Sequence, residues 1–224
     1  MDGLWREIDG YCERVGPQYW AEPVNAVTNL GFVLIAFFMW QRSAGVPLAR
    51  ALAVILGLIG LGSYLFHTHA QVWAAIADVM PIAAFILLYL FAVNRDVWGM
   101  PLWAALVGTV LFIPYTIVTV PLWENLPILG VSAGYVPVPV LIILYALFLW
   151  RRAPNLARGF MTGAGILFAS LSARGLDETL CAQWAIGTHF LWHILNAIML
   201  GWMIEVYRRY VVTSQRPVQA VSET

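Results

Sequence analysis

The stretch "GTHFLWHILNAIMLGWMIEVY", residues 187–207, is long and apolar enough to cross a lipid bilayer, although it carries two histidines. Six other apolar stretches reach a comparable length: residues 24–41, 48–68, 72–93, 100–120, 133–150 and 157–174. Only 11% of the 224 residues are charged, whereas an average soluble domain has about 25%. We therefore predict an all-α polytopic membrane protein with a bundle of seven transmembrane helices.

Short connections rich in Pro, Gly and Arg separate the predicted helices, so the chain has no room for a soluble second domain. We expect a single seven-helix membrane domain over residues 1–210, which includes a short N-terminal segment. A disordered cytoplasmic tail is expected over residues 211–224. Because the first 23 residues are polar, they do not resemble a cleavable signal peptide.

The distribution of arginines predicts how the bundle is oriented in the membrane. The chain has 12 arginines and no lysine, and nine of the arginines fall on one side of the predicted topology. By the positive-inside rule this side is cytoplasmic. We therefore predict that the protein lies in the cell membrane with its N-terminus outside the cell and its C-terminus in the cytoplasm. The formal net charge of zero gives no indication of nucleic-acid binding, so the lipid bilayer is the expected partner.

Four ionisable residues fall at one depth of this topology, near the outer membrane surface: His67, Asp78, His189 and His193. Ionisable side chains inside a membrane are costly, so we treat them as candidate functional residues. His189 and His193 stand four positions apart and share one helix face, which is how a helix presents two ligands to one metal. With His67 they would give three protein ligands and leave a position open for water, as in catalytic zinc sites.

Simpler roles remain open for each of these residues. A single histidine near a membrane surface is often an interfacial anchor or a contact between helices, and we keep that reading for His69. Asp78 could act as a general base and acid beside a metal, or could be a polar contact between helices. Ser63, one turn before His67, could donate to a developing oxyanion or could be a packing residue. A haem or copper site fits a histidine pair on one helix less well.

The N-terminal segment "IDGYCERVGPQYWAEPVN" concentrates oxygen ligands of the kind that calcium prefers, from Asp9, Glu13, Glu22 and Asn25. The alternative is a solvated acidic segment, with Glu22 at the positive end of the first helix. Cys12 and Cys181 both fall on the outer side, where one disulfide is permitted. We predict that they are bonded, the alternative being two unpaired cysteines.

Three groups of motifs together resemble the alkaline ceramidases, a family within the seven-helix membrane hydrolases that also include the adiponectin receptors. The matching pieces are "YCER" with "WAEPVNAVTNLGF", "GLGSYLFH" with "ADVMPI", and "LDETLC" with "THFLWHILN". They follow one another in order along most of the chain. The resemblance implies a lipid amide hydrolase that releases a fatty acid and a sphingoid base from ceramide.

The resemblance also assigns residues to roles. It implies that His67, His189 and His193 bind a catalytic zinc, with Ser63 and Asp78 beside it. It further implies that calcium is held by acids corresponding to Asp9, Glu13 and Glu22, and that Cys12 and Cys181 form a disulfide. The family has an additional Asn shortly after the acid that Glu13 matches, whereas Arg14 and Val15 follow here.

Three other functions are compatible with parts of this sequence. A lipid receptor could keep zinc for structure, and a hydrolase could act on a different N-acyl lipid with the same chemistry. A transporter would also place His and Asp in helices, but the sequence lacks the paired interrupted helices that typify such folds.

Overall fold

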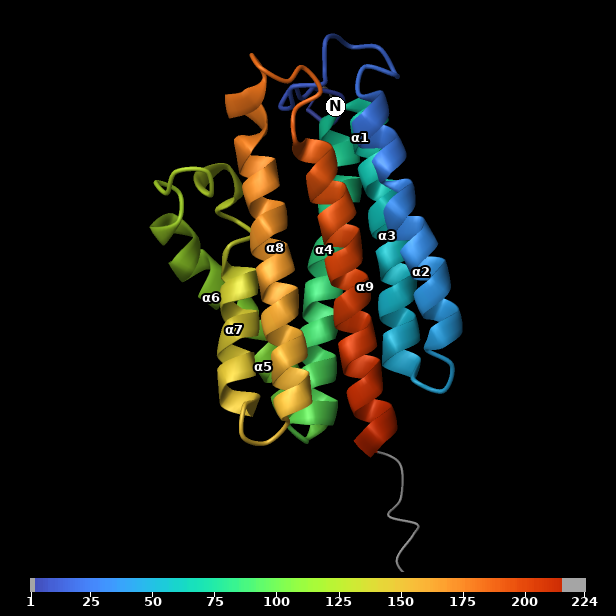
Figure 1. The fold of residues 1–224 in the computed structure, drawn as a ribbon, viewed down its shortest axis with the longest axis vertical. Coiled ribbons are helices and arrows are strands. Elements are labelled where there is room, and N and C mark those ends of the chain that lie inside the picture. The colour runs from blue at the N-terminus through green and yellow to red at the C-terminus, as the bar shows by residue number, and fades with distance from the viewer. Residues whose placement is uncertain (1–2, 215–224) are drawn as a thin grey trace, which may run out of the picture.

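The structure, a computed structural model, describes residues 3–214. Within this range the regular elements are helices, and the strand-like pairing is limited to one isolated bridge between Glu7 and Gln71. The long helices run along one common axis and form an upright bundle (Figure 1). The predicted all-α fold is therefore confirmed for the described residues.

The α-helices are α1 (Pro23–Thr28), α2 (Leu30–Arg42), α3 (Pro47–His69), α4 (Val72–Ala92), α5 (Leu102–Val110), α6 (Phe112–Thr119), α7 (Pro137–Leu149), α8 (Pro154–Leu180) and α9 (His189–Ser214). A π-helical turn, Val93–Val97, extends α4, and short 3₁₀ turns lie at Val120–Leu122 and Gly130–Ser132. Proline begins α1, α3, α7 and α8, where its fixed φ suits the first helical turn and its missing N–H is not needed.

Six helical segments of the described chain are long and apolar enough to cross a membrane: Pro23–Arg42, Pro47–His69, Val72–Val97, Leu102–Leu122, Pro154–Leu180 and His189–Ser214. They match six of the seven predicted stretches closely. The remaining predicted stretch, residues 133–150, corresponds to α7, which has only 13 residues. Residues 133–136, the first four of the predicted stretch, form turns, and the helix begins at Pro137.

Apolar side chains cover the outside of this bundle as well as its core. Phe37, Ile117 and Phe148 are each more than 60% exposed, at 65%, 69% and 73%. Such an outer surface is stable in lipid, whereas a soluble protein rarely exposes a large apolar area. The chain is thus an integral membrane protein in character, with α9 the span most enclosed by its neighbours.

Glycines set the closest approaches between helices. A Cβ atom on Gly62 of α3 would lie 2.1 Å from the carbonyl oxygen of Ala77 on α4, so only glycine fits there. On α8, a Cβ on Gly163 would lie 2.4 Å from the sulfur of Met203 on α9. Small residues let membrane helices pack backbone against backbone, and Gly62 fixes the spacing of α3 and α4 in this way.

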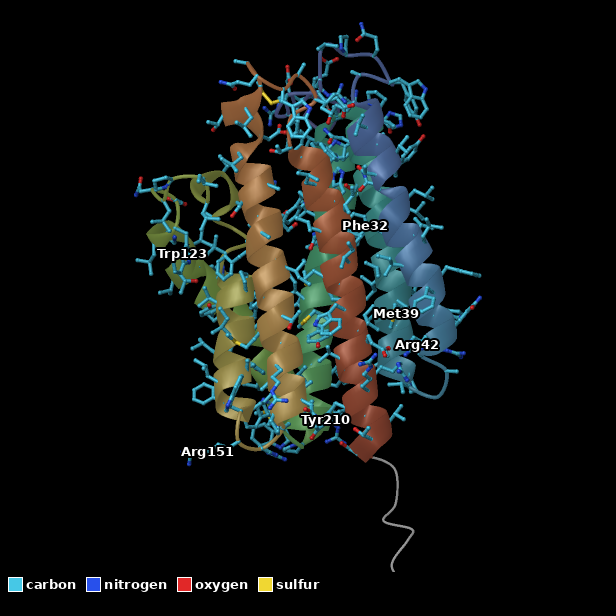
Figure 2. The ribbon with its side chains drawn as sticks, in the orientation of Figure 1. Phe32, Met39, Arg42, Trp123, Arg151 and Tyr210 are labelled. Atoms are coloured by element: carbon cyan, nitrogen blue, oxygen red, sulfur yellow. A yellow bond between two sulfur atoms is a disulfide. The ribbon has the colours of Figure 1, made fainter. Side chains whose placement is uncertain are left out.

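The two ends of the bundle differ in chemistry. At the end opposite the N-terminus, Arg42 and Arg151 lie near the surface (Figure 2), and Glu205 of α9 accepts hydrogen bonds from Arg42, Arg208 and Arg209. The helix α9 continues to Ser214, beyond residue 211 where the tail was predicted to begin. The rest of that predicted tail, 215–224, lies outside the described residues.

At the other end, the N-terminal segment folds back over the helix ends. Cys12 and Cys181 form a disulfide that ties this segment to the C-terminal end of α8, as predicted. The segment also pairs with the turn between α3 and α4, because the Ile8 amide donates to the carbonyl of Ala70. This arrangement holds residues 3–20, the N-terminal cover, over the end of the bundle.

The close approach at Gly62 predicts that two glycine-to-alanine substitutions change the stability of the protein in opposite directions. Gly62→Ala places a methyl group against backbone that cannot turn aside, and we expect a loss of about 1–3 kcal/mol in stability. Gly165→Ala on α8 is the matched control, because a Cβ there meets nothing within 4 Å, and it should gain about 0.5–1 kcal/mol. Thermal unfolding in detergent measures both variants, and equal midpoints would contradict the proposed helix contact.

Candidate metal centre

Three histidine rings meet inside the bundle near the N-terminal segment. His67 lies in the last turn of α3, His189 begins α9, and His193 lies one turn further along α9. Their exposed fractions are 1%, 2% and 1%. One ring nitrogen from each lies within 4.8 Å of the others, which is close enough for all three to bind one ion.

The hydrogen bonds of these rings show which nitrogens are available to a metal. The Nδ1 atom of His67 bonds to the carboxylate of Glu22 at 2.6 Å, and Nδ1 of His193 bonds to the hydroxyl of Thr28 at 2.9 Å. The buried Nε2 of His193 and Nδ1 of His189 have no hydrogen-bond partner. A buried polar atom without a partner is costly, and a metal ion would satisfy both. The donor set therefore fits a metal held by imidazoles.

Glu22 and Thr28 hold their histidines in one tautomer. A carboxylate only accepts, so the proton of His67 is on Nδ1 and the lone pair of Nε2 is free. Thr28 donates its own hydrogen to helix carbonyls, at 2.8 Å from Val24 and 3.0 Å from Asn25, so its oxygen accepts from His193. Such outer partners orient metal-binding imidazoles and raise their affinity for the ion.

Asp177 fixes the third histidine through the backbone. This buried carboxylate accepts the amide hydrogens of Thr188 and His189 at 2.6 and 2.8 Å, where the first turn of α9 has no intrahelical partners. Its second oxygen accepts the amide of Cys12 at 2.9 Å. One side chain thus caps the helix that carries two histidines and anchors the N-terminal segment. The sequence analysis did not identify Asp177 as a site residue.

Ser63 and Asp78 lie next to the histidines. Ser63 is buried one turn before His67 on α3, and Asp78 lies beside Ser63 on α4 and within electrostatic reach of His67 and Arg174. Gly62 allows this proximity, because a Cβ at that position would lie 3.1 Å from the Cα of Asp78. All five residues expected at the zinc centre are thus neighbours in the structure.

Tyr11 and Arg174 also belong to this region, although the sequence analysis gave neither a role in the site. The Tyr11 ring stacks on His189 with centroids 3.6 Å apart. Burial raises the pKa of the Tyr11 phenol, which therefore keeps its proton. Arg174 donates to the carbonyl of Val131 and to Ser132 and contributes positive charge near Asp78. The position of Tyr11 directly before Cys12 is the one signal that could have indicated it.

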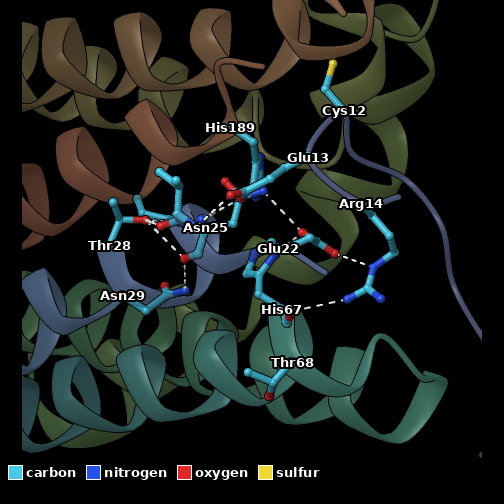
Figure 3. A network of polar contacts seen from close by, with 12 residues as sticks. Cys12, Glu13, Arg14, Glu22, Asn25, Thr28, Asn29, His67, Thr68 and His189 are labelled. Atoms are coloured by element: carbon cyan, nitrogen blue, oxygen red, sulfur yellow. Dashed lines mark hydrogen bonds and ion pairs between the residues drawn. The ribbon is translucent and has the colours of Figure 1, made fainter. Parts of the chain in front are cut away.

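The acids expected to bind calcium do not form a comparable group. Asp9 is exposed, and Glu13 accepts the amides of Val24 and Asn25 at the start of α1. Glu22 is paired with Arg14 and His67 (Figure 3). Within residues 3–214, the histidine triad is the one group of His, Cys, Asp or Glu that gathers its ligand atoms. The donor set of these acids does not fit calcium.

His69 differs from the three clustered histidines, as expected. Its ring is exposed, and its neighbours are Tyr19 and Trp73, with centroids 5.3 and 5.0 Å away. It is the last residue of α3, where its exposed ring lies beside the N-terminal cover at Tyr19.

The contact between Thr28 and His193 predicts an effect on metal affinity. Thr28→Val keeps the shape but leaves Nδ1 of His193 without an acceptor, so we expect zinc to bind about 10–100-fold more weakly. Thr162→Val is the control, because this exposed hydroxyl bonds only to its own helix at Arg158. Zinc titration against a chelator of known affinity measures both, and an unchanged affinity in Thr28→Val would contradict the proposed orientation of His193.

Comparison with known proteins agrees with the geometry of this site. A family model described as Ceramidase matches residues 8–222, which is nearly the whole chain and includes every residue of the histidine centre. No curated protein matches the chain. On the extent of the family match, the chain belongs to the ceramidase family.

Proposed function

We propose that this protein is a zinc-dependent intramembrane hydrolase that cleaves the amide bond of ceramide-like N-acyl lipids. The products are a free fatty acid and a sphingoid base. The observation that supports this most directly is the convergence of three buried imidazoles beside Ser63 and Asp78, in a chain of the ceramidase family. An amide is hard to hydrolyse, so it requires both an activated water and a polarised carbonyl.

His67, His189 and His193 would hold the zinc. When bound, the ion supplies a water of lowered pKa and a Lewis acid for the carbonyl oxygen. Asp78 accepts a proton from the attacking water and returns it to the nitrogen of the leaving amine as the C–N bond breaks. Ser63 donates a hydrogen bond to the carbonyl oxygen as negative charge develops there.

We assign the acyl chain to an apolar groove along α4 and α6. The groove has a volume of about 820 Å³, and its lining includes Tyr135 and Val79, the residue that follows Asp78 in the sequence. Further along it is lined by Ile86, Phe112 and Val138, which also line an internal apolar pocket deeper in the bundle. Mainly apolar walls suit a hydrocarbon chain, with the amide held at the polar end.

The proposed topology has seven spans, with the N-terminus outside and the C-terminus in the cytoplasm of the cell membrane. One of these spans is α7, whose 13 residues give a helix about 20 Å long. The turns that precede Pro137 lengthen this span. Non-helical backbone is tolerated at membrane depth where protein covers it, and Arg174 of α8 bonds to this segment at Val131 and Ser132. The disulfide at the opposite end from Arg42 and Arg151 supports the same orientation.

Purified zinc-loaded protein incubated with a panel of N-acyl lipids tests the activity, with released fatty acid measured by mass spectrometry. Asp78→Asn should lower the rate by about 10²–10⁴-fold, the typical contribution of general acid and base catalysis. His193→Ala should abolish it. His69→Ala is the control and should keep full activity, since this ring lies outside the cluster.

Two results would contradict the proposal. One is the absence of fatty acid release from every N-acyl lipid by protein that contains zinc, which would favour a receptor that keeps the metal for structure. The other is equal hydrolysis by the wild type and by folded His193→Ala.

A further inference from the structure

The side chain of Arg14 enters the interior of the N-terminal cover and is surrounded there by oxygen atoms. Its exposed fraction is 4%, and that of its partner Glu22 is 3%. The guanidinium donates to the Glu22 carboxylate at 2.5 Å, to the Gly16 carbonyl at 3.0 Å and to the His67 carbonyl at 3.1 Å. A carboxylate and two carbonyls are the ligands that a hard cation selects, and here a protein cation already occupies them.

Arg14 contacts His67 by two routes (Figure 3). One is direct, because the carbonyl of His67 lies in the last turn of α3, where carbonyls lack an intrahelical donor, and Arg14 supplies it. The other passes through Glu22, whose second oxygen accepts from Nδ1 of His67 at 2.6 Å. The backbone and the ring of this histidine are therefore held by the same guanidinium.

We propose that Arg14 is a positioning residue for the metal centre, which takes the place of a bound divalent cation in the N-terminal segment and makes the protein independent of calcium. The inference deepens the proposed function and rests on it for the identity of the metal. It explains why the Glu22 carboxylate is paired within the protein. Glu22 has no free oxygen for calcium, since its two oxygens serve Arg14, Asn25 and His67.

The geometry requires arginine at this position. The planar guanidinium presents five N–H donors in a fixed fork, which lets it contact Glu22, Gly16 and His67 at once. A lysine ammonium carries the same charge but is a compact point donor. A lysine would keep the ion pair with Glu22 but would lose the hydrogen bond to at least one of the two carbonyls, those of Gly16 and His67.

Zinc affinity of Arg14→Ala tests the positioning role, measured by competition with a chelator. We expect zinc to bind about 10–100-fold more weakly, as when an outer partner of a metal-binding histidine is lost. Millimolar guanidinium ion added to this variant should restore affinity, because it refills the same contacts. Urea at the same concentration has a similar shape and no charge, so it should restore nothing.

Arg158→Ala is the matched control, because this arginine is exposed on α8 and, among the described residues, its side chain makes one hydrogen bond, to Asn155 at 3.4 Å. It should bind zinc like the wild type. Arg14→Lys should bind zinc with an affinity between those of the wild type and Arg14→Ala, and this result decides the matter even if the alanine variant does not fold. Wild-type zinc affinity in Arg14→Ala or Arg14→Lys would overturn the proposal.

Calcium independence is tested on the wild type alone. Calcium chloride added to zinc-loaded protein should leave the thermal midpoint unchanged, and calorimetric titration should detect no calcium binding. A rise in midpoint with saturable binding would overturn the proposal. If Arg14 controls zinc affinity but no lipid is hydrolysed, only the proposed function fails; if lipid is hydrolysed and Arg14 has no effect, only this inference fails.

Discussion

Polar atoms buried in an apolar bundle must find partners, and the histidine cluster is where this constraint is most demanding. Three buried imidazole rings lie with their centroids 4.6–5.1 Å apart, and Glu22 and Thr28 bond to one nitrogen of His67 and one of His193. Nε2 of His193 and Nδ1 of His189 have no hydrogen-bond partner, and one nitrogen from each ring lies within 4.8 Å of the others, so a single ion can bind all three rings. The surrounding fold holds the three rings together although some of their nitrogens lack hydrogen-bond partners.

Each ring is held by a different part of the chain, and these parts are joined at the N-terminal cover. Arg14 and Glu22 hold His67, while Asp177 caps the helix that carries the other two histidines. Asp177 also binds the amide of Cys12, whose disulfide links the cover to α8. Loss of the cover would therefore remove the Arg14 contact with His67 and the Tyr11 ring that stacks on His189. The cover is part of the centre rather than a separate segment.

Much of this arrangement could be predicted from the sequence. Apolar length located the helices, but α8 and α9 continue to Leu180 and Ser214, beyond the predicted ends at 174 and 207, and α7 begins only at Pro137. Helical periodicity placed His189 and His193 on one face, and membrane depth added His67. The partners of these rings could not be predicted, because contacts such as Thr28 to His193 join residues 165 positions apart. The calcium prediction gains no support from the fold for a similar reason: composition shows that acids are present, but only the fold shows that Arg14 is paired with Glu22.

The proposed chemistry requires that the three imidazoles share one zinc ion. X-ray absorption at the zinc K-edge of the purified protein tests this directly, because it reports the type, number and distance of the ligands. The result expected is one zinc per chain with three imidazole nitrogens at about 2.0–2.1 Å and one oxygen as the fourth ligand. Protein that folds without zinc, or a spectrum dominated by oxygen or sulfur ligands, would contradict it.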